Sequence, residues 1–296
     1  MKIKLILLSL LFIINVFNYS IIQINAKDKI EIVLQEKQNT LHTHYQVLSH
    51  MQKTTASTIY QSTLEVPGLL QILTEANTAT NERKKTLRKS LHKLIEKKYE
   101  IVKEKGILQY QFVLLNNESF YRAHKPNKFG DNLTDIRMDF KYANETQEPI
   151  SGLVQGKFTH GFRNTFPLFN AQNKHIGAME ISFSSDSIQS YLSKLNKVHS
   201  VFKVTSYTDN NALIKYAQSA EHKSYLFLAN KLHTEENCFL QNCEELDSIR
   251  ATISAKVALL QSFSLYVDNP TTNSIEIISF IPIKNMENKV NAWIEH

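Results

Sequence analysis

The sequence predicts an α+β protein in which a long N-terminal helix is followed by two modules with antiparallel sheets. Neither glycine nor proline occurs in residues 27–66, which favours one uninterrupted helix. From residue 107 onward, short runs of alternating apolar and polar residues are separated by Asn, Gly or Asp, as in strands joined by turns. With 296 residues, the chain has room for two modules of ordinary size, each with its own core.

Residues 1–26 predict a membrane anchor or a signal peptide. Lys2 and Lys4 precede an apolar run from Leu5 to Ile24. A run of about 20 residues suits a membrane span, and lysines before it suit a cytoplasmic start. Alternatively, Ala26 before Lys27 would suit cleavage by signal peptidase. In both cases the bulk of the chain lies outside the cytoplasm.

Residues 27–66 carry apolar positions at heptad spacing. Two adjacent rows follow this spacing: Leu34, Leu41, Leu48 and Thr55 in one, and Tyr45, Gln52 and Ile59 in the other. Either the helix packs on its own sheet through these rows, or they form a weak dimer face on a signalling helix. The polar Gln52 and Thr55 argue against a permanent coiled coil.

The remaining elements follow from periodicity and turn residues. Helices are predicted at 69–76 and about 81–105, then strands at 107–115, 119–125, 149–155, 160–169 and 175–183. Asp186 with Gln189 indicates the start of a helix running to about 197. These elements make a first module, 67–197. A second, 198–296, has predicted strands near 201–207 and 224–229, a helix at 248–260, and a hairpin that pairs 263–267 with 275–283.

One stretch of the first module suggests recognition of a small molecule. Phe120, Arg122 and His124 share one face of a predicted strand, because side chains alternate along it. Pro126 then removes a backbone donor, and Gly130 permits a positive φ in the following loop. An arginine and a histidine are therefore presented side by side at a strand end.

The same stretch resembles a known family. Arg-x-His-Lys-Pro-x-x-Phe-Gly-Asp-x-Leu at 122–133 is followed by Ile136-Arg137, and further matches are Gly152, Gly156, Gly161-Phe162-Arg163, Pro167, Ile176-Gly177 and Glu180. Residues 279–284 resemble the family's closing strand. Over residues 40–294 the chain resembles the double Cache sensors, in the double sensory domain branch. Leu153-Val154-Gln155 stands where the family pattern leads us to expect an acidic residue.

The resemblance implies two PAS-like (Cache) modules, with 67–197 membrane-distal and 198–296 membrane-proximal. Proteins of this family are the extracytoplasmic parts of histidine kinases, chemoreceptors and diguanylate cyclases. The resemblance therefore also implies a small-molecule ligand, an uncleaved inner-membrane anchor at residues 5–24, and a homodimer through the long helix.

Three arginines are the leading candidates for ligand contacts. The chain has six arginines against 28 lysines, and Arg122, Arg137 and Arg163 fall in its strand-rich part. The planar guanidinium matches carboxylate or phosphate oxygens, so we expect an anionic or zwitterionic ligand. The alternative is internal pairing, of Arg122 with Asp131, Arg137 with Asp135 or Asp139, and Arg163 with Glu180.

Four further residues are candidate contacts. His124 either reaches the ligand or braces the Pro126 loop, and Asp131 either binds an amine or stabilises its turn. Tyr110 and Phe162 either line the pocket or belong to the core.

The net charge of +6 does not indicate nucleic-acid binding. Residues 82–105 hold ten Lys or Arg against four Glu, so one amphipathic helix accounts for the excess as its solvated side. No zinc-finger spacing or RNA-recognition motif accompanies it.

The two cysteines and the absence of catalytic motifs limit the chemistry that we expect of this chain. Cys238 and Cys243 are most simply a disulfide in an exported chain, since a metal site would need more ligands than His233. We find no nucleophile elbow, phosphate loop, His-Glu-x-x-His or dinucleotide motif, and we expect no enzyme activity, metal or cofactor.

The sequence therefore predicts the extracytoplasmic small-molecule sensor of a bacterial transmembrane receptor. The ligand would bind the membrane-distal module, and the long helix would pass on the signal. A kinase or cyclase output domain would lie beyond the chain. The alternative is a secreted or membrane-anchored periplasmic binding protein without its own output domain.

Overall fold

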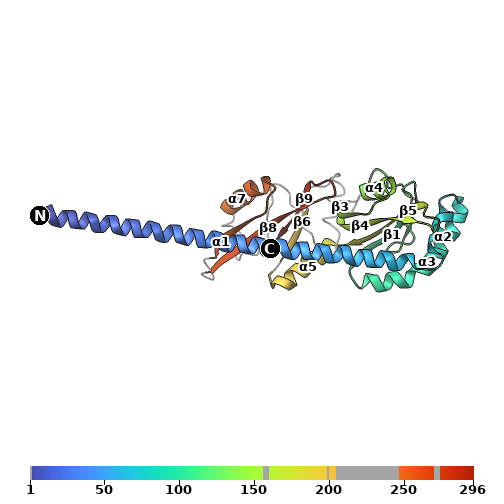
Figure 1. The fold of residues 1–296 in the computed structure, drawn as a ribbon, viewed down its shortest axis with the longest axis horizontal. Coiled ribbons are helices and arrows are strands. Elements are labelled where there is room, and N and C mark those ends of the chain that lie inside the picture. The colour runs from blue at the N-terminus through green and yellow to red at the C-terminus, as the bar shows by residue number, and fades with distance from the viewer. Residues whose placement is uncertain (1, 156–159, 199, 205–246, 270–273) are drawn as a thin grey trace.

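The computed structural model describes residues 2–155, 160–198, 200–204, 247–269 and 274–296. One long helix, α1 (Lys2–Leu64), runs along two successive antiparallel sheets, which confirms the predicted α+β class (Figure 1). The strand predicted at 224–229 and the cysteines Cys238 and Cys243 lie outside the described residues.

Helix α1 is longer than the predicted 27–66 because it continues without a break through the apolar N-terminal run. The large apolar side chains described between Ile3 and Ile24 are exposed, and this part of α1 projects from the globular part (Figure 1). Within the described residues, α1 alone is long and apolar enough to cross a membrane, with a mean hydropathy of 1.9 in its most apolar window. The helix ends just before Pro67-Gly68, and Gly68 takes a φ of 82°.

The first sheet follows α2 (Leu69–Ala76) and α3 (Asn81–Lys103), whose N-terminus is capped by the Thr80 side chain. Its strands are β1 (Ile107–Val113), β2 (Ser119–Arg122), β3 (Ile150–Gln155), β4 (His160–Phe169) and β5 (His175–Phe183), in the antiparallel order β2-β1-β5-β4-β3. Strand β2 is shorter than predicted because Lys125 N bonds Arg122 O at 3.2 Å and closes a turn.

The two faces of this sheet are covered differently. Helices α1, α2 and α3 share an apolar core with one face, through Tyr110, Phe112 and Ile181. On the other side, α4 (Met138–Thr146) packs Phe140 and Ala143 against Val113 and Ala178. The remaining helix, α5 (Ser185–Asn196), begins earlier than expected: its N-cap is Ser184, whose hydroxyl accepts from Ser187 N.

The second sheet has the antiparallel order β6-β9-β8-β7, formed by β6 (Val201–Val204), β7 (Phe263–Asn269), β8 (Ser274–Lys284) and β9 (Val290–Glu295), with α7 (Asp247–Ala258) beside it. The predicted β7–β8 hairpin is confirmed, with Phe263 opposite Phe280. The prediction that residues 279–284 close the chain's last sheet was wrong. Strand β9 follows and inserts between β8 and β6, burying Trp293 and Ile294.

The heptad rows of α1 face inward, not toward a second chain. Leu41 and Leu48 are 1% and 6% exposed, in a core with Phe162, Phe202 and Ile281 that joins α1 to both sheets. Tyr45 packs on this core, Gln52 donates to Ser187 at 3.3 Å, and Ile59 belongs to the core under the first sheet. Packing on the chain's own sheets is therefore the correct interpretation of these rows.

Candidate functional site

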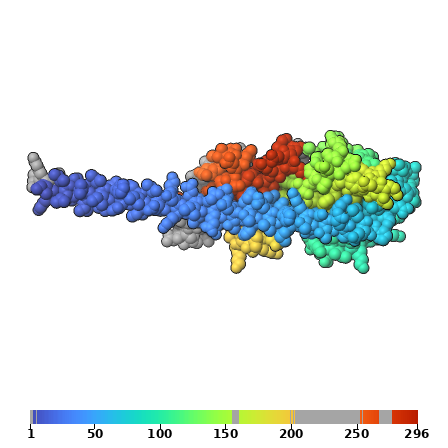
Figure 2. Space-filling view, in the orientation of Figure 1, coloured from blue at the N-terminus to red at the C-terminus, as the bar shows by residue number. Residues whose placement is uncertain are grey.

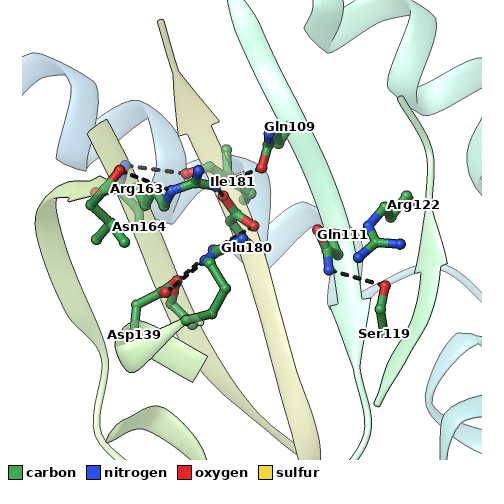
Figure 3. A network of polar contacts seen from close by, with 12 residues as sticks. Gln109, Gln111, Ser119, Arg122, Asp139, Arg163, Asn164, Glu180 and Ile181 are labelled. Carbon is green, nitrogen blue, oxygen red and sulfur yellow. Dashed lines mark hydrogen bonds and ion pairs between the residues drawn. The ribbon is translucent and has the colours of Figure 1, made fainter. Parts of the chain in front are cut away.

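Polar side chains cover the face of the first sheet that points away from α1, α2 and α3. The strand register places Arg122, Gln111, Glu180 and Thr165 in one transverse row, and Gln109, Ser182 and Arg163 in the next. Because side chains alternate along a strand, these residues oppose the apolar Tyr110, Phe112 and Ile181. Figure 3 shows several of them converging. We call these seven residues the polar face.

A buried carboxylate lies at the centre of the polar face. Glu180 is fully buried, with Oε2 at 2.8 Å from Arg137 Nη2, and Oε1 accepts a hydrogen bond from Arg163 Nη1. Arg163 Nη1 also donates to Gln109 Oε1 at 2.5 Å. Burial alone would raise the pKa of Glu180, but the charges of Arg137 and Arg163 outweigh this and hold the pKa below its ordinary value.

Two residues at the start of α4 complete this network: Arg137, just before the helix, and Asp139, in its first turn. Arg137 donates to both carboxylate oxygens of Asp139, at 2.8 and 2.6 Å, and Thr165 Oγ1 donates to Asp139 at 2.7 Å. Burial would raise the pKa of Asp139, yet the Arg137 charge keeps it below its ordinary value. Two buried guanidiniums thus balance two buried carboxylates, a requirement for keeping such charges away from water.

Arg122 belongs to a separate and more open ion pair. Its Nη1 and Nη2 each lie 2.7 Å from an oxygen of Asp131, and Nη1 also donates to Lys128 O at 2.9 Å. These bonds tie the loop after β2 to the strand. The hydrogen bonds from Arg122 lower the pKa of Asp131. The Asp131 side chain is 42% exposed, whereas those of Asp139 and Glu180 are fully buried.

The internal pairing that the sequence left open is therefore present at all three predicted arginines. Arg122 pairs with Asp131, Arg137 with Asp139 and Glu180, and Arg163 with Glu180. A ligand contact at these residues stays a prediction.

Two polar groups near these pairs have neither a hydrogen-bond nor an ion-pair partner among the described residues. They are His124 Nδ1 and Ser182 Oγ, both shielded from solvent. The His124 ring lies close enough to Glu180 and Arg122 to feel their charges. Burial is the main cause that lowers the pKa of His124 to about 4, so the ring is neutral near pH 7.

The predicted aromatic contacts lie elsewhere. Tyr110 is fully buried beneath α1, where its hydroxyl is 2.6 Å from Thr63 Oγ1. Phe162 packs against Phe202 and Tyr45, with ring centroids 5.6 and 6.4 Å away, in the core that joins the two sheets. Phe162 adjoins Arg163 in sequence, so the two point to opposite faces of the sheet. The expectation that Tyr110 and Phe162 line a site with the arginines was wrong.

Sequence reasoning did not name Gln109, Gln111, Thr165 and Ser182 as site residues. The available signal was the alternation of Gln109 and Gln111 with Tyr110 and Phe112, which already separates a polar from an apolar side of β1. No group of three or more His, Cys, Asp or Glu side chains within the described ranges is arranged to hold a metal ion.

The fold is similar to that of solved sensory domains. A domain of a sensory box/GGDEF family protein from Vibrio parahaemolyticus has a TM-score of 0.46 at 15% identity, covering 90% of this chain and 95% of that one. The ligand-binding domain of the Campylobacter jejuni chemoreceptor Tlp3, in complex with 4-methylisoleucine, has a TM-score of 0.46 at 11% identity, covering 90% of each chain.

A third structure is the ligand-binding domain of the Pseudomonas aeruginosa amino acid chemoreceptor PctC in complex with GABA, with a TM-score of 0.36 at 12% identity, covering 88% of this chain and 98% of that one. These are sensory domains. No protein-family model matches the sequence, and comparison with curated proteins gives no match.

Replacing Arg137 by alanine tests the buried network. We expect Arg137→Ala to lower the free energy of unfolding by about 3–5 kcal/mol, because Asp139 and Glu180 would lose a charge partner in a buried place. Chemical denaturation followed by circular dichroism measures this change. Arg83→Ala is the control, since its pair with Glu75 is exposed and should matter little. Equal effects of the two substitutions would contradict the network's importance.

Stability should depend on His124 in mildly acidic solution. The unfolded chain protonates this histidine below its ordinary pKa of 6.5, whereas the folded chain does so only near pH 4. The unfolded state therefore binds more protons between these values, and the free energy of unfolding should fall as pH drops from about 6.5 to about 4, by at most about 1.4 kcal/mol per pH unit.

Denaturation at a series of pH values checks this expectation. His296, whose pKa burial also lowers to about 4, contributes in the same direction. His124→Gln should therefore flatten the pH dependence in part. An unchanged slope would show that His124 titrates alike in both states.

Proposed function

We propose that this chain is the extracytoplasmic sensor region of a bacterial transmembrane receptor, anchored in the inner membrane by the apolar part of α1. A small anionic or zwitterionic molecule binds at the polar face of the membrane-distal sheet. The observation that carries this proposal is that two buried, unpartnered groups, His124 Nδ1 and Ser182 Oγ, lie on the same side of the sheet as Arg122. Unsatisfied buried polar groups are uncommon in folded proteins, and an incoming ligand would satisfy them.

The three arginines have different roles in this proposal. Arg137 and Arg163 are held by fully buried carboxylates, so they shape the polar face. Arg122 is paired with a carboxylate that solvent already reaches, on a loop. Asp131 can turn outward at small cost, and the Arg122 guanidinium can then take a ligand carboxylate in the same two-bond geometry.

Charge balance favours a zwitterion over a simple anion. Arg122, Arg137 and Arg163 are matched by Asp131, Asp139 and Glu180. A molecule with a carboxylate for Arg122 and an amine for Asp131 preserves this balance. An anion alone leaves Asp131 without a partner, which its exposure makes tolerable.

The signal reaches α1 through the opposite face of the same sheet. Tyr60 of α1 donates to Pro167 O of β4 at 2.7 Å, and Thr63 bonds the Tyr110 hydroxyl of β1. A ligand that changes how β1 and β4 lie must therefore change their packing on α1. It shifts α1 only as far as it binds one arrangement more tightly than the other.

The homodimer of this proposal uses the exposed side of α1. Val33, Thr40, Val47 and Thr54 lie seven residues apart and are all exposed, on a flank about 100° around the helix from the buried Leu41 and Leu48. Val33 and Val47 are β-branched, as is common at one seam position of two-stranded parallel coiled coils. This row replaces the Leu34–Thr55 row as the dimer face.

A thermal-shift screen of amino acids, amines and organic acids tests the ligand site, because a ligand that binds only the folded state raises the melting temperature. Arg122→Ala should weaken binding of a hit by about 2 kcal/mol or more, roughly 30-fold. Ser182→Ala should cost about 1 kcal/mol of binding through the lost hydrogen bond. It removes no hydrogen bond described within the protein.

The controls separate ligand types and unrelated effects. Asp131→Asn should weaken a zwitterion and leave a simple anion bound as well or better. Ser90→Ala, on the exposed side of α3, should change nothing. If a hit binds both Arg122→Ala and Ser182→Ala as tightly as it binds the parent chain, the ligand site lies elsewhere.

Cysteine cross-linking in membranes tests the dimer face. Val47→Cys should form an oxidised dimer, because equivalent seam positions of parallel helices face each other. Gln46→Cys, exposed on the flank of the same turn, is the matched control. Equal cross-linking of the two variants, beyond that of the parent chain, would exclude the proposed seam.

A further inference from the structure

An apolar tip projects from the second sheet module where α7 meets β7. Leu259 and Leu260 are adjacent in sequence and 67% and 54% exposed, and Tyr266 of β7 is 46% exposed. The turn is ordered by hydrogen bonds from Leu259 N to Lys256 O and from Leu260 N to Val257 O, at 3.1 and 3.0 Å. Leu260 has a φ of 54°, a left-handed conformation that is unfavourable for leucine. The fold therefore holds these leucines outward.

The tip lies beside the place where α1 leaves its apolar run. A groove between α1 and the second sheet is lined from both sides, by Ile24, Lys27 and Ile30 of α1 and by Lys256, Ser262, Phe263 and Tyr266. Ile24 is the last residue of the exposed apolar run. Figure 1 places α7 at the end of the globular part from which the N-terminal half of α1 projects, and Figure 2 shows its surface there.

We propose that this tip rests on the surface of the lipid bilayer that α1 crosses. The inference depends on the membrane anchoring proposed above and adds a second contact with the membrane. Leucine side chains enter the boundary between headgroups and acyl chains, and tyrosine is enriched at that depth. Lys27 and Lys256 can extend their ammonium groups to lipid phosphates.

The charges in the groove fit this orientation. Lys27 lies three residues beyond Ile24, at the level of the headgroups if the apolar run fills the hydrocarbon layer. Glu31, the carboxylate in the groove, lies seven residues beyond Ile24, which is about 10 Å further from the apolar layer along the helix. The cationic group is thus nearer the lipid phosphates than the anionic one.

Tryptophan quenching by brominated lipids tests the contact in the full chain. The chain has one tryptophan, Trp293, so Trp293→Phe gives a background for single probes. Leu260→Trp reports on the tip, Phe12→Trp on the membrane span, and Ile101→Trp on the exposed surface of α3. The variants are reconstituted in vesicles of equal parts phosphatidylcholine and phosphatidylglycerol, brominated either near the headgroup or near the bilayer centre.

Leu260→Trp should be quenched more by bromines near the headgroup than by bromines near the centre. Phe12→Trp should be quenched strongly by central bromines, and Ile101→Trp by neither. If Phe12→Trp is quenched while Leu260→Trp behaves like Ile101→Trp, the anchor stands and the tip contact is wrong. If Phe12→Trp is not quenched, both the anchor and the tip contact are wrong.

Two additions keep the experiment decisive. Should Trp293→Phe fail to fold, the probes are placed in the parent chain and its quenching is subtracted, since Trp293 is only 1% exposed. A Leu260→Trp emission that is blue-shifted in vesicles and insensitive to bromine at both depths would show that the tip is buried against protein, which overturns the lipid contact.

Discussion

The contact of Glu180 with two buried guanidiniums is the constraint on which the rest of the first sheet depends. A carboxylate in the middle of the central strand loses its hydration, and only close cations can offset that cost. Arg163 supplies one cation from the neighbouring strand, and Arg137 supplies the other from the segment before α4. The network therefore fixes where α4 lies on the sheet, because Arg137 must reach both Asp139 and Glu180.

This constraint divides the arginines by what their partners permit. Charges buried in pairs are costly to separate, so Arg137 and Arg163 stay bound to their carboxylates and hold a fixed position on the sheet. The Arg122–Asp131 pair sits at the rim, on a loop, with solvent already at the carboxylate. A ligand can replace one member of an ion pair at the lowest cost in free energy where the displaced side chain can return to water. Among the pairs of these three arginines, only Arg122–Asp131 has such a partially exposed side chain, that of Asp131.

In the proposed receptor, helix α1 connects the ligand site to the membrane, because one side of the helix packs on the sheets while an adjoining flank stays exposed. One side buries Leu41 and Leu48 against both sheets, so it follows their arrangement. A flank about 100° around the helix exposes a row of valine and threonine, suited to an adjustable contact with a second helix. The second sheet is held beside the same helix near the end of its apolar run, so motion of α1 and contact with the bilayer would be linked.

Local sequence patterns were sufficient to predict the long helix, the strands at 160–169 and 175–183, the β7–β8 hairpin and the possible partners of each arginine. These rest on local rules of periodicity, turn residues and complementary charge. The packing of the folded chain was needed to show that Leu41 and Leu48 face the chain's own sheets. The same apolar residues at heptad spacing would suit either a core within the chain or a dimer interface. Packing also showed that the faces carrying Tyr110 and Phe162 are the ones that helices cover. Alternation tells which residues share a face of a strand, but what covers that face depends on residues far away in sequence.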